Sequence, residues 1–298
     1  MSMLQAHAGL AGRNAVLIGG ATGIGRAVAL KLAEAGVNIA SCDNDAEGVA
    51  AIAPEVEAYG VNILSAFADV RDVAALGAFF DQVEATFDSV DILVNIAGGT
   101  NRGAFVESTP ENDAELNRLN YGYVLDSTRR MVPLIRRTGQ GGAIVNFTTI
   151  EAHRGAAGYA VYAAAKAAVT NFTRAVAVEL GKERIRVNIV APDTSPSRAY
   201  ARRKGAEEGR MARYNALSAA ARAEAWRMYV PQQAPPGIDD LANAVLFLVS
   251  DLARCVTGQV LHVDGGTSAS MGFIDWPFGD GHGPAPQPES LHRLFGEG

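Results

Sequence analysis

Two side chains with acid–base potential, Tyr162 and Lys166, are separated by Ala-Ala-Ala near the middle of the chain. This stretch favours a helix, and a spacing of four residues puts the phenol and the ammonium on one helical face. A free tyrosine has a pKa of about 10 and a free lysine of about 10.4, but an adjacent cation favours the phenolate and lowers the tyrosine's pKa. The pair can therefore exchange a proton with a substrate oxygen, although this spacing also occurs in helices that have no catalytic role.

A glycine-rich segment, Gly-Gly-Ala-Thr-Gly-Ile-Gly at 19–25, lies between the first predicted strand and the first predicted helix. Glycines let the backbone turn tightly and approach a pyrophosphate, and the helix N-terminus supplies free N–H groups with partial positive charge. A glycine-rich turn alone is weak evidence, but the strand–turn–helix context predicts a dinucleotide site. The residues expected to contact the cofactor here are Gly19, Thr22, Gly23, Ile24 and Gly25.

Acidic residues end the second and third predicted strands. Asp43 can accept hydrogen bonds from the adenosine ribose hydroxyls and would repel a 2′-phosphate, which favours NAD over NADP. The alternative is a solvated turn residue that caps the next helix, a role that suits Asp45 better. Asp69 and Val70 follow the third strand, where the carboxylate could meet the adenine edge or cap the helix that follows.

Further motifs follow in order along the chain, and together they are far more specific than any one of them. They are NIAG at 95–98, Asn120, IVNFTT at 144–149, YAAAK at 162–166, VNIVAP at 187–192 and TGQVLHVDGG at 257–266. With the glycine-rich segment, this ordered set resembles the short-chain dehydrogenase/reductase family. The resemblance runs from about residue 10 to residue 266.

The resemblance implies a role for each matching residue. Tyr162 would donate or remove the proton at the substrate oxygen, and Lys166 would lower the pKa of Tyr162 and bind the nicotinamide ribose. Thr149 would hydrogen-bond the substrate oxygen, and Asn120 would hold a water that links Lys166 to solvent. The other positions implied to contact the cofactor are Asn95, Ala97 and Gly98 in the cleft, and Pro192 and Ser195 at the carboxamide.

Four residues depart from the family's usual pattern. Ile18 stands where threonine is usual before the first glycine, and Ile96 replaces the second asparagine of an NNAG-like motif. Thr149 replaces serine, keeping the hydroxyl but adding a methyl group that restricts χ1. Asp193 replaces the glycine that normally follows the VNIVAP motif. None of these changes removes an indispensable group, so we expect activity with an altered pocket.

The segment between Thr149 and Tyr162 would border the substrate pocket, and it contains Glu151 and His153. Two interpretations of these side chains remain open at this point: both could line the pocket, or both could lie on a surface loop.

The elements that must position these residues alternate between short apolar runs and Ala-rich helical stretches. The apolar runs are continuous, as in strands that helices cover on both faces. Repeated βα units with right-handed crossovers predict an α/β fold with a doubly wound parallel sheet, the Rossmann fold, in a single domain. The predicted strands are 15–18, 37–42, 61–68, 90–95, 143–148, 185–191 and 259–263, and the predicted helices are 24–35, 45–59, 72–87, 110–137, 158–181 and 238–250.

Two segments interrupt this alternation. Within a catalytic domain at 10–266, residues 193–236 form an insertion too long for a plain connection, which we expect to be a partly helical lid over the substrate. Its stretch 198–227 carries eight basic and three acidic side chains, which could attract an anionic substrate or simply form a solvated face. The Gly- and Pro-rich segment 267–298 is a C-terminal extension outside the resemblance.

The composition of the 298 residues excludes several classes of function. The net charge of −6 argues against a general nucleic-acid binder. Cys42 and Cys255 form no CxxC pair, so neither a disulfide framework nor a zinc site is expected. No apolar run approaches the roughly 20 residues that span a bilayer, and the N-terminus lacks signal-peptide features, so we expect a cytoplasmic protein without a membrane partner.

The sequence thus predicts an NAD(H)-dependent oxidoreductase that interconverts a small-molecule secondary alcohol and a ketone without a metal. The family resemblance implies a homotetramer with helices 110–137 and 158–181 at its interfaces. One alternative is an NADP-dependent 3-oxoacyl-thioester reductase, which the basic insertion supports. Another is a non-catalytic dinucleotide-sensing protein, against which the intact Tyr162, Lys166 and Asn120 count.

Overall fold

Short apolar segments pair as parallel strands in the computed structural model, which describes residues 8–100, 102–193, 216–276, 281–285, 290 and 292–293. The central strands are buried except at the first residue of two of them, because helices cover both faces of the sheet. The strand order β3-β2-β1-β4-β5-β6-β7 reverses direction between β1 and β4, where ligands of this fold bind. The strands are β1 (Asn14–Ile18), β2 (Asn38–Asp43), β3 (Ile63–Phe67), β4 (Ile92–Asn95), β5 (Gly142–Phe147), β6 (Ile185–Pro192) and β7 (Val260–Val263).

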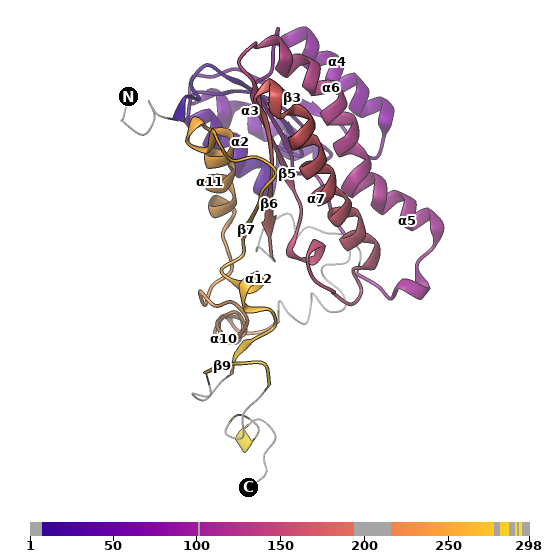
Figure 1. Cartoon of the computed structure of the whole chain (residues 1–298), viewed down its shortest axis with the longest axis vertical. Helices are drawn as coiled ribbons and strands as arrows, with labels where there is room; N and C mark the ends of the chain where they lie inside the picture. The colour runs from indigo at the N-terminus through magenta and orange to yellow at the C-terminus, as the bar shows by residue number, and fades with distance from the viewer. Residues whose placement is uncertain are drawn as a thin grey trace. The chain divides into compact units, whose positions relative to one another are not determined.

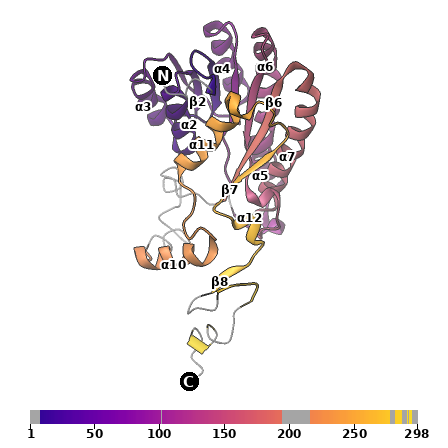
Figure 2. The same ribbon diagram turned by 60° about the vertical axis from the view of Figure 1, so that its left-hand side comes forward.

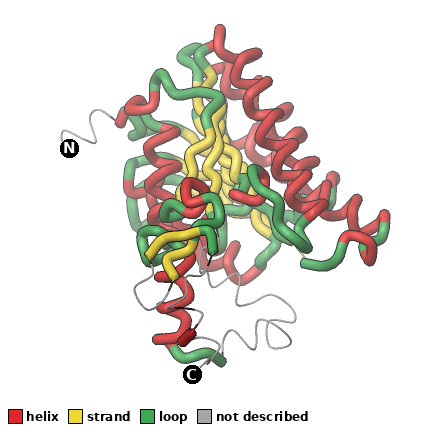
Figure 3. The backbone as a smooth tube through the Cα atoms, turned by 60° about the horizontal axis from the view of Figure 1, so that its bottom comes forward, coloured by secondary structure: helices red, strands yellow, loops and turns green. Residues whose placement is uncertain are grey.

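Helices lie on both sides of this sheet. α2, α3 and α11 lie on one side and α4, α5, α6 and α7 on the other (Figures 1 and 2), and Figure 3 shows the strands between the two groups. On the first side α2 packs against α11, and on the second α5 packs against α7. The helices are α2 (Gly23–Glu34), α3 (Ala46–Glu57), α4 (Val73–Thr86), α5 (Pro110–Asn117), α6 (Tyr123–Arg137), α7 (Ala160–Leu180) and α11 (Ile238–Val249).

Alternating side chains of the strands supply the core. Val16 and Ile18 of β1 join one buried cluster with Phe79 of α4 and Met131 of α6, and Leu17 faces the opposite way. Because both faces are packed in this manner, the predicted doubly wound parallel sheet is confirmed, with strand and helix limits close to those expected from the sequence.

The helix predicted over 110–137 has the expected limits, but its α-helical pattern is interrupted by one turn of another kind. α5 ends at Asn117, and a π-helical turn over Arg118–Gly122 separates it from α6. A π turn widens the helix and turns a side chain out of its regular position, and such turns are frequent at functional sites. Here the turn carries Asn120, whose side chain is buried.

The insertion and the C-terminal extension form a second compact unit, made of Pro192–Gly237 and His262–Gly298. Its described elements are α10 (Ala219–Tyr229), α12 (Thr267–Ser270), and the antiparallel pair β8 (Ile274–Trp276) and β9 (Gly281–Gly283). α10 packs against β8, and Arg227 bridges Glu224 at 2.9 Å and Asp275. Packing and the Arg227 ion pair thus join two segments that are far apart in the sequence.

Candidate active site

The glycine-rich loop between β1 and α2 has a backbone that only glycine allows at two positions. Gly19 has φ +90°, and a Cβ on it would lie 2.8 Å from the backbone nitrogen of Ala97. A Cβ on Gly25 would lie 1.8 Å from the carbonyl oxygen of Gly19. Thr22 is the N-cap residue of α2, and within the described part of the chain its side chain makes no capping hydrogen bond. The N–H groups of the first turn of α2 are therefore open to an anion. The loop thus fits the pyrophosphate of a dinucleotide.

Asp43 ends β2 beside this loop and is buried. Its carboxylate accepts hydrogen bonds from the backbone N–H of Ala21 at 3.1 Å, from Thr22 Oγ1 at 3.4 Å and from the backbone N–H of Asp45 at 3.2 Å. Burial raises the pKa of Asp43, while the backbone hydrogen bonds oppose that shift. The N-terminal cap of α3 is Asp45, which accepts from the N–H of Gly48 at 2.9 Å. Asp43 is therefore held at the loop and does not cap the helix.

Asp69, the residue predicted at the adenine edge, lies in an ion-pair cluster next to buried Val70. Arg71 donates to both its carboxylate oxygens, from Nε and from Nη2 at 2.6 Å, and lowers the pKa of Asp69 to about 2. Asn44 donates to the same carboxylate at 3.3 Å. The cap of α4 is Asp72, so Asp69 is not the capping residue. Asp69 stays ionised and available as an acceptor over the physiological pH range.

Lys166 and Asn120 converge on the backbone after β4. Lys166 lies two turns into α7 and is buried, and its Nζ donates to the carbonyl oxygen of Phe147 at 3.1 Å. Burial lowers the pKa of Lys166 to about 8. A Cβ on Gly98 would lie 3.0 Å from Lys166 Nζ and 2.9 Å from Asn120 Oδ1. Glycine at this position thus leaves the room in which the two polar groups approach each other.

The π-helical turn fixes the side chain of Asn120. Its Nδ2 donates to the carbonyl oxygens of Gly99 at 2.8 Å and Leu116 at 3.0 Å, and its Oδ1 accepts from the N–H of Gly99 at 3.1 Å. The Asn120 amide therefore holds the loop after β4 both as a donor to Gly99 and as an acceptor from it. The sequence indicated Asn120 only through the family motif, because a π turn leaves no clear periodic signal.

Asn95 is fully buried and takes part in a polar network between elements. Its Nδ2 donates to Asn146 Oδ1 at 2.8 Å, and its Oδ1 accepts from Ser127 at 2.7 Å. Asn146 in turn donates to Thr173 at 2.9 Å. The Asn95 side chain thus ties β4 to β5, α6 and α7, and a contact between Asn95 and the cofactor stays a prediction.

Tyr123 is a residue that the sequence did not indicate as part of the site. It is completely buried in α6, and its hydroxyl donates to the carbonyl oxygen of Ala97 at 2.7 Å. The N–H of Ala97 donates to Ile18 at the end of β1. Tyr123 belongs to none of the motifs in the sequence, so nothing there indicated its contact with the loop after β4.

Thr149 follows β5 and is buried, with its hydroxyl already engaged. Thr149 Oγ1 donates to Glu151 Oε2, and the other oxygen of Glu151 accepts from Arg154 Nη2 at 2.9 Å. Glu151 belongs to a single 3₁₀ turn, Ile150–Ala152, which Thr149 caps. Of the two side chains considered for the pocket, Glu151 thus contacts the predicted substrate-binding hydroxyl directly.

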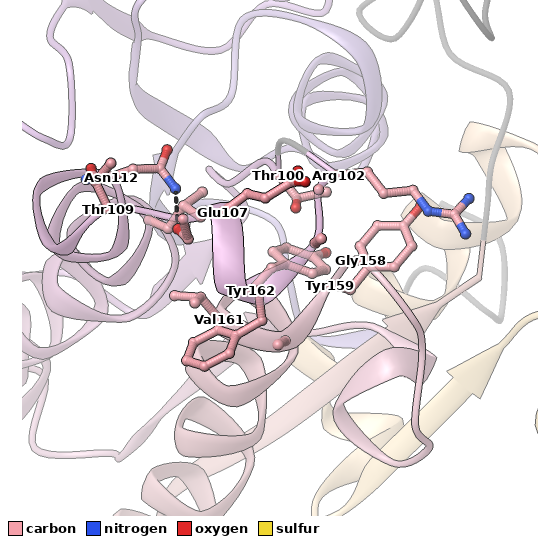
Figure 4. Close-up of a pocket in the computed structure, with 15 residues that line it drawn as sticks. Thr100, Arg102, Glu107, Thr109, Asn112, Gly158, Tyr159, Val161 and Tyr162 are labelled. Atoms are coloured by element: carbon pink, nitrogen blue, oxygen red, sulfur yellow. Dashed lines mark hydrogen bonds between the residues drawn. The ribbon is translucent and has the colours of Figure 1, made fainter.

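Tyr162 lies at the start of α7 beside a pocket of about 290 Å³ (Figure 4). The ring centroids of Tyr162 and Tyr159 lie 6.1 Å apart. The guanidinium group of Arg102 lies over the Tyr159 ring, with its Cζ 5.2 Å from the ring centroid. Neither Glu151 nor His153 is among the described residues that line this pocket. Its lining includes Thr100, Phe105, Glu107, Thr109, Asn112 and Val161.

The remaining predicted positions follow β6. Pro192 is the last residue of that strand, and Asp193 accepts a hydrogen bond from the Tyr229 hydroxyl at 2.7 Å. Ser195 lies outside the described residues. Over the described ranges, no group of three or more His, Cys, Asp or Glu side chains could hold a metal ion, and no helix is long and apolar enough to cross a membrane.

A family model described as "Enoyl-(Acyl carrier protein) reductase" matches residues 19–268. The chain is 30% identical to 3beta-hydroxysteroid dehydrogenase 2 of Eggerthella lenta over 271 residues, covering 90% of this chain and all of that one. It is 32% identical to the 3-oxoacyl-(acyl-carrier-protein) reductase FabG of Staphylococcus epidermidis, covering 85% and 98% of the two chains. The structure of carveol dehydrogenase from Mycobacterium avium in complex with NAD superposes with a TM-score of 0.78 at 30% identity, covering 87% and 98%.

Proposed function

Because this chain belongs to the short-chain dehydrogenase/reductase family, we propose that it is an NAD(H)-dependent enzyme that interconverts a secondary alcohol and a ketone. The observation that carries this proposal is the convergence of buried Lys166 and Asn120 at Gly98. Lys166 lies on α7, the helix that also contains Tyr162. A buried amine with a lowered pKa, one helical turn from a phenol, is the arrangement that acid–base chemistry near neutral pH requires.

NAD supplies a hydride acceptor at the nicotinamide ring when it is bound. Gly19, Gly25 and the first turn of α2 would hold its pyrophosphate, and Asp43 would accept from the adenosine ribose. Asp69 and Val70 would meet the adenine, and Lys166 would bind the nicotinamide ribose. The described residues fit such a cofactor, because glycines leave the loop open and an acidic group stands at the ribose position.

Tyr162 would take the proton of the substrate hydroxyl during oxidation and return it during reduction. Charged Lys166 favours the phenolate form of Tyr162, and Asn120 keeps the loop beside Lys166 in place. The hydroxyls of Thr149 and Tyr162 would stabilise the negative charge that develops on the substrate oxygen, which is the largest catalytic contribution expected in such a site.

The proposal is tested by measuring NADH formation with a panel of steroid, terpene, alicyclic and hydroxyacyl alcohols, in parallel with NADPH formation from NADP. Turnover with NAD supports the proposal. Turnover confined to NADP with hydroxyacyl thioesters, or in the reverse direction to NADPH with 3-oxoacyl thioesters, would instead favour the reductase activity that the similarity to FabG raises. Cofactor binding without any turnover would favour a dinucleotide sensor. The proposed homotetramer is checked separately by light scattering on the purified protein.

A further inference from the structure

The hydroxyl assigned to the substrate oxygen already donates elsewhere. Thr149 has one hydroxyl proton, and Glu151 Oε2 accepts it. The backbone N–H of Glu151 lies 3.5 Å from the same Thr149 oxygen, too long for a strong hydrogen bond. In this arrangement Thr149 can only accept from a ligand, although the reaction needs it as a donor toward the developing alkoxide.

Glu151 competes strongly for that proton. A hydrogen bond to a carboxylate is stronger than one to a neutral ketone or alcohol oxygen. The Glu151 side chain is only 14% exposed, and Arg154 satisfies just one of its two oxygens. A substrate that merely drew the Thr149 hydroxyl away would leave Glu151 Oε2 buried and under-satisfied, which is unfavourable.

We propose that Glu151 determines specificity by selecting a substrate with a hydroxyl group on the carbon next to the reacting carbon, a vicinal diol or its α-hydroxyketone. The neighbouring hydroxyl donates to Glu151 Oε2 in place of Thr149. The Thr149 hydroxyl is then released to donate to the reacting oxygen. An alcohol without this second donor keeps Thr149 bound to Glu151 or leaves the carboxylate unsatisfied.

This inference rests on the proposed function and keeps its chemical balance. The C–H bond at the reacting carbon breaks and its electron pair leaves with hydrogen as hydride to NAD, which is reduced. The proton of the hydroxyl group on that carbon passes to Tyr162, and a C=O bond forms. The neighbouring hydroxyl is unchanged, so a vicinal diol gives an α-hydroxyketone, NADH and a proton.

Three matched alcohols distinguish the effect of a hydrogen-bond donor on the neighbouring carbon from the effect of the size or polarity of the group there. They are cyclohexanol, trans-2-methoxycyclohexanol and trans-1,2-cyclohexanediol. The ether has an oxygen at the neighbouring carbon but no donor. A site built to bind a substrate hydroxyl discriminates strongly against analogues that lack it, so we expect the wild type to favour the diol by at least about a hundredfold in kcat/KM over both others. Most of the difference should lie in kcat, because Thr149 acts on the transition state.

Two variants test Glu151 itself. Glu151→Leu should bring the three alcohols to within about tenfold of one another, whereas Glu151→Gln should retain part of the preference because its carbonyl oxygen still accepts. The matched control is Glu107→Leu, which removes a carboxylate that lines the pocket beside Tyr162 but does not contact Thr149, and it should retain the diol preference. NADH binding, followed by fluorescence, should be unchanged in the Glu151 variants, which excludes a general loss of structure.

Equal wild-type turnover of the diol and the ether would overturn the inference, as would a diol preference that persists in Glu151→Leu or disappears in Glu107→Leu. These results leave the proposed function intact, since the wild type still oxidises alcohols with NAD. If the wild type oxidises no alcohol of the wider panel, the proposed function itself fails and this inference fails with it.

Discussion

The region proposed for the cofactor and the region proposed for the reaction each place a buried or nearly buried carboxylate beside a threonine hydroxyl. At the cofactor end, Asp43 accepts from Thr22 and from the backbone N–H groups of Ala21 and Asp45. At the reaction end, Glu151 accepts from Thr149 and from a guanidinium group. The first carboxylate is held mainly by backbone and the second only by side chains.

This difference separates a fixed acceptor from an exchangeable one. Two of the three donors to Asp43 are the backbone N–H groups of Ala21 and Asp45, which cannot leave without a change in the loops after β1 and β2. The donors to Glu151 are side chains that rotate independently of the backbone. Asp43 therefore suits a part of the ligand that never changes, the cofactor ribose, and Glu151 suits a part that differs between substrates.

The largest expected effect is a loss of turnover without a loss of cofactor binding. Tyr162→Phe removes only the ionisable oxygen and should lower kcat by roughly 10²–10⁴-fold. NADH binding should persist, because the loop and Asp43 are untouched. Steady-state rates and NADH fluorescence titration check this. A variant that kept more than about a tenth of the wild-type rate would remove Tyr162 from its role as acid–base group.

Thr149→Val tests the reaction end without changing side-chain shape. We expect a loss of roughly 10²–10³-fold in kcat, the effect of removing one donor to a developing oxyanion. Thr149→Ser is the matched control and should stay active, since it keeps the hydroxyl. Equal rates for Thr149→Val and the wild type would show that another group holds the substrate oxygen.

Lys166 should make stability depend on pH in the protein without cofactor. Its pKa of about 8 in the folded state lies below the value of about 10.4 expected in the unfolded chain. Between these values the unfolded state binds more protons, so stability rises with pH, by about 3 kcal/mol over the whole interval.

Denaturant unfolding of the wild type and Lys166→Met at pH 7 to 10.5 measures this contribution. The free energy of unfolding of the wild type should increase relative to the variant as the pH rises above about 8. A difference that stays constant over this range would show that Lys166 keeps an ordinary pKa despite its burial.

The smallest effect concerns cofactor choice at Asp43. We expect kcat/KM with NAD(H) to exceed that with NADP(H) by at least roughly tenfold, about 1.4 kcal/mol, because a 2′-phosphate would face the carboxylate. Asp43→Ala should narrow the ratio, and Asp45→Ala, which removes the cap of α3, should not. Comparable efficiency of the wild type with both cofactors would argue against the ribose assignment.

Local sequence patterns were sufficient for much of the fold. Continuous apolar runs predicted the parallel strands, and the glycines at 19 and 25 predicted the loop that positive φ and close backbone contacts require. The helix at 110–137 shows where such patterns fail, because its periodicity gives no sign of the π turn at Asn120. Family motifs supplied Asn120 and Thr149, but not what their side chains contact.

The sequence by itself determined the spacing of Tyr162 and Lys166 and the open glycine loop, since helix geometry and backbone sterics act over a few residues. Only the tertiary structure brought Lys166 to Asn120 across 46 residues of chain, tied Asn95 to Thr173, and joined Arg227 to Asp275. It also turned the Thr149 hydroxyl toward Glu151, although these residues are neighbours, because the loop conformation and burial determine which acceptor a hydroxyl meets. Such contacts depend on how separate elements pack, and no periodicity within one segment encodes them.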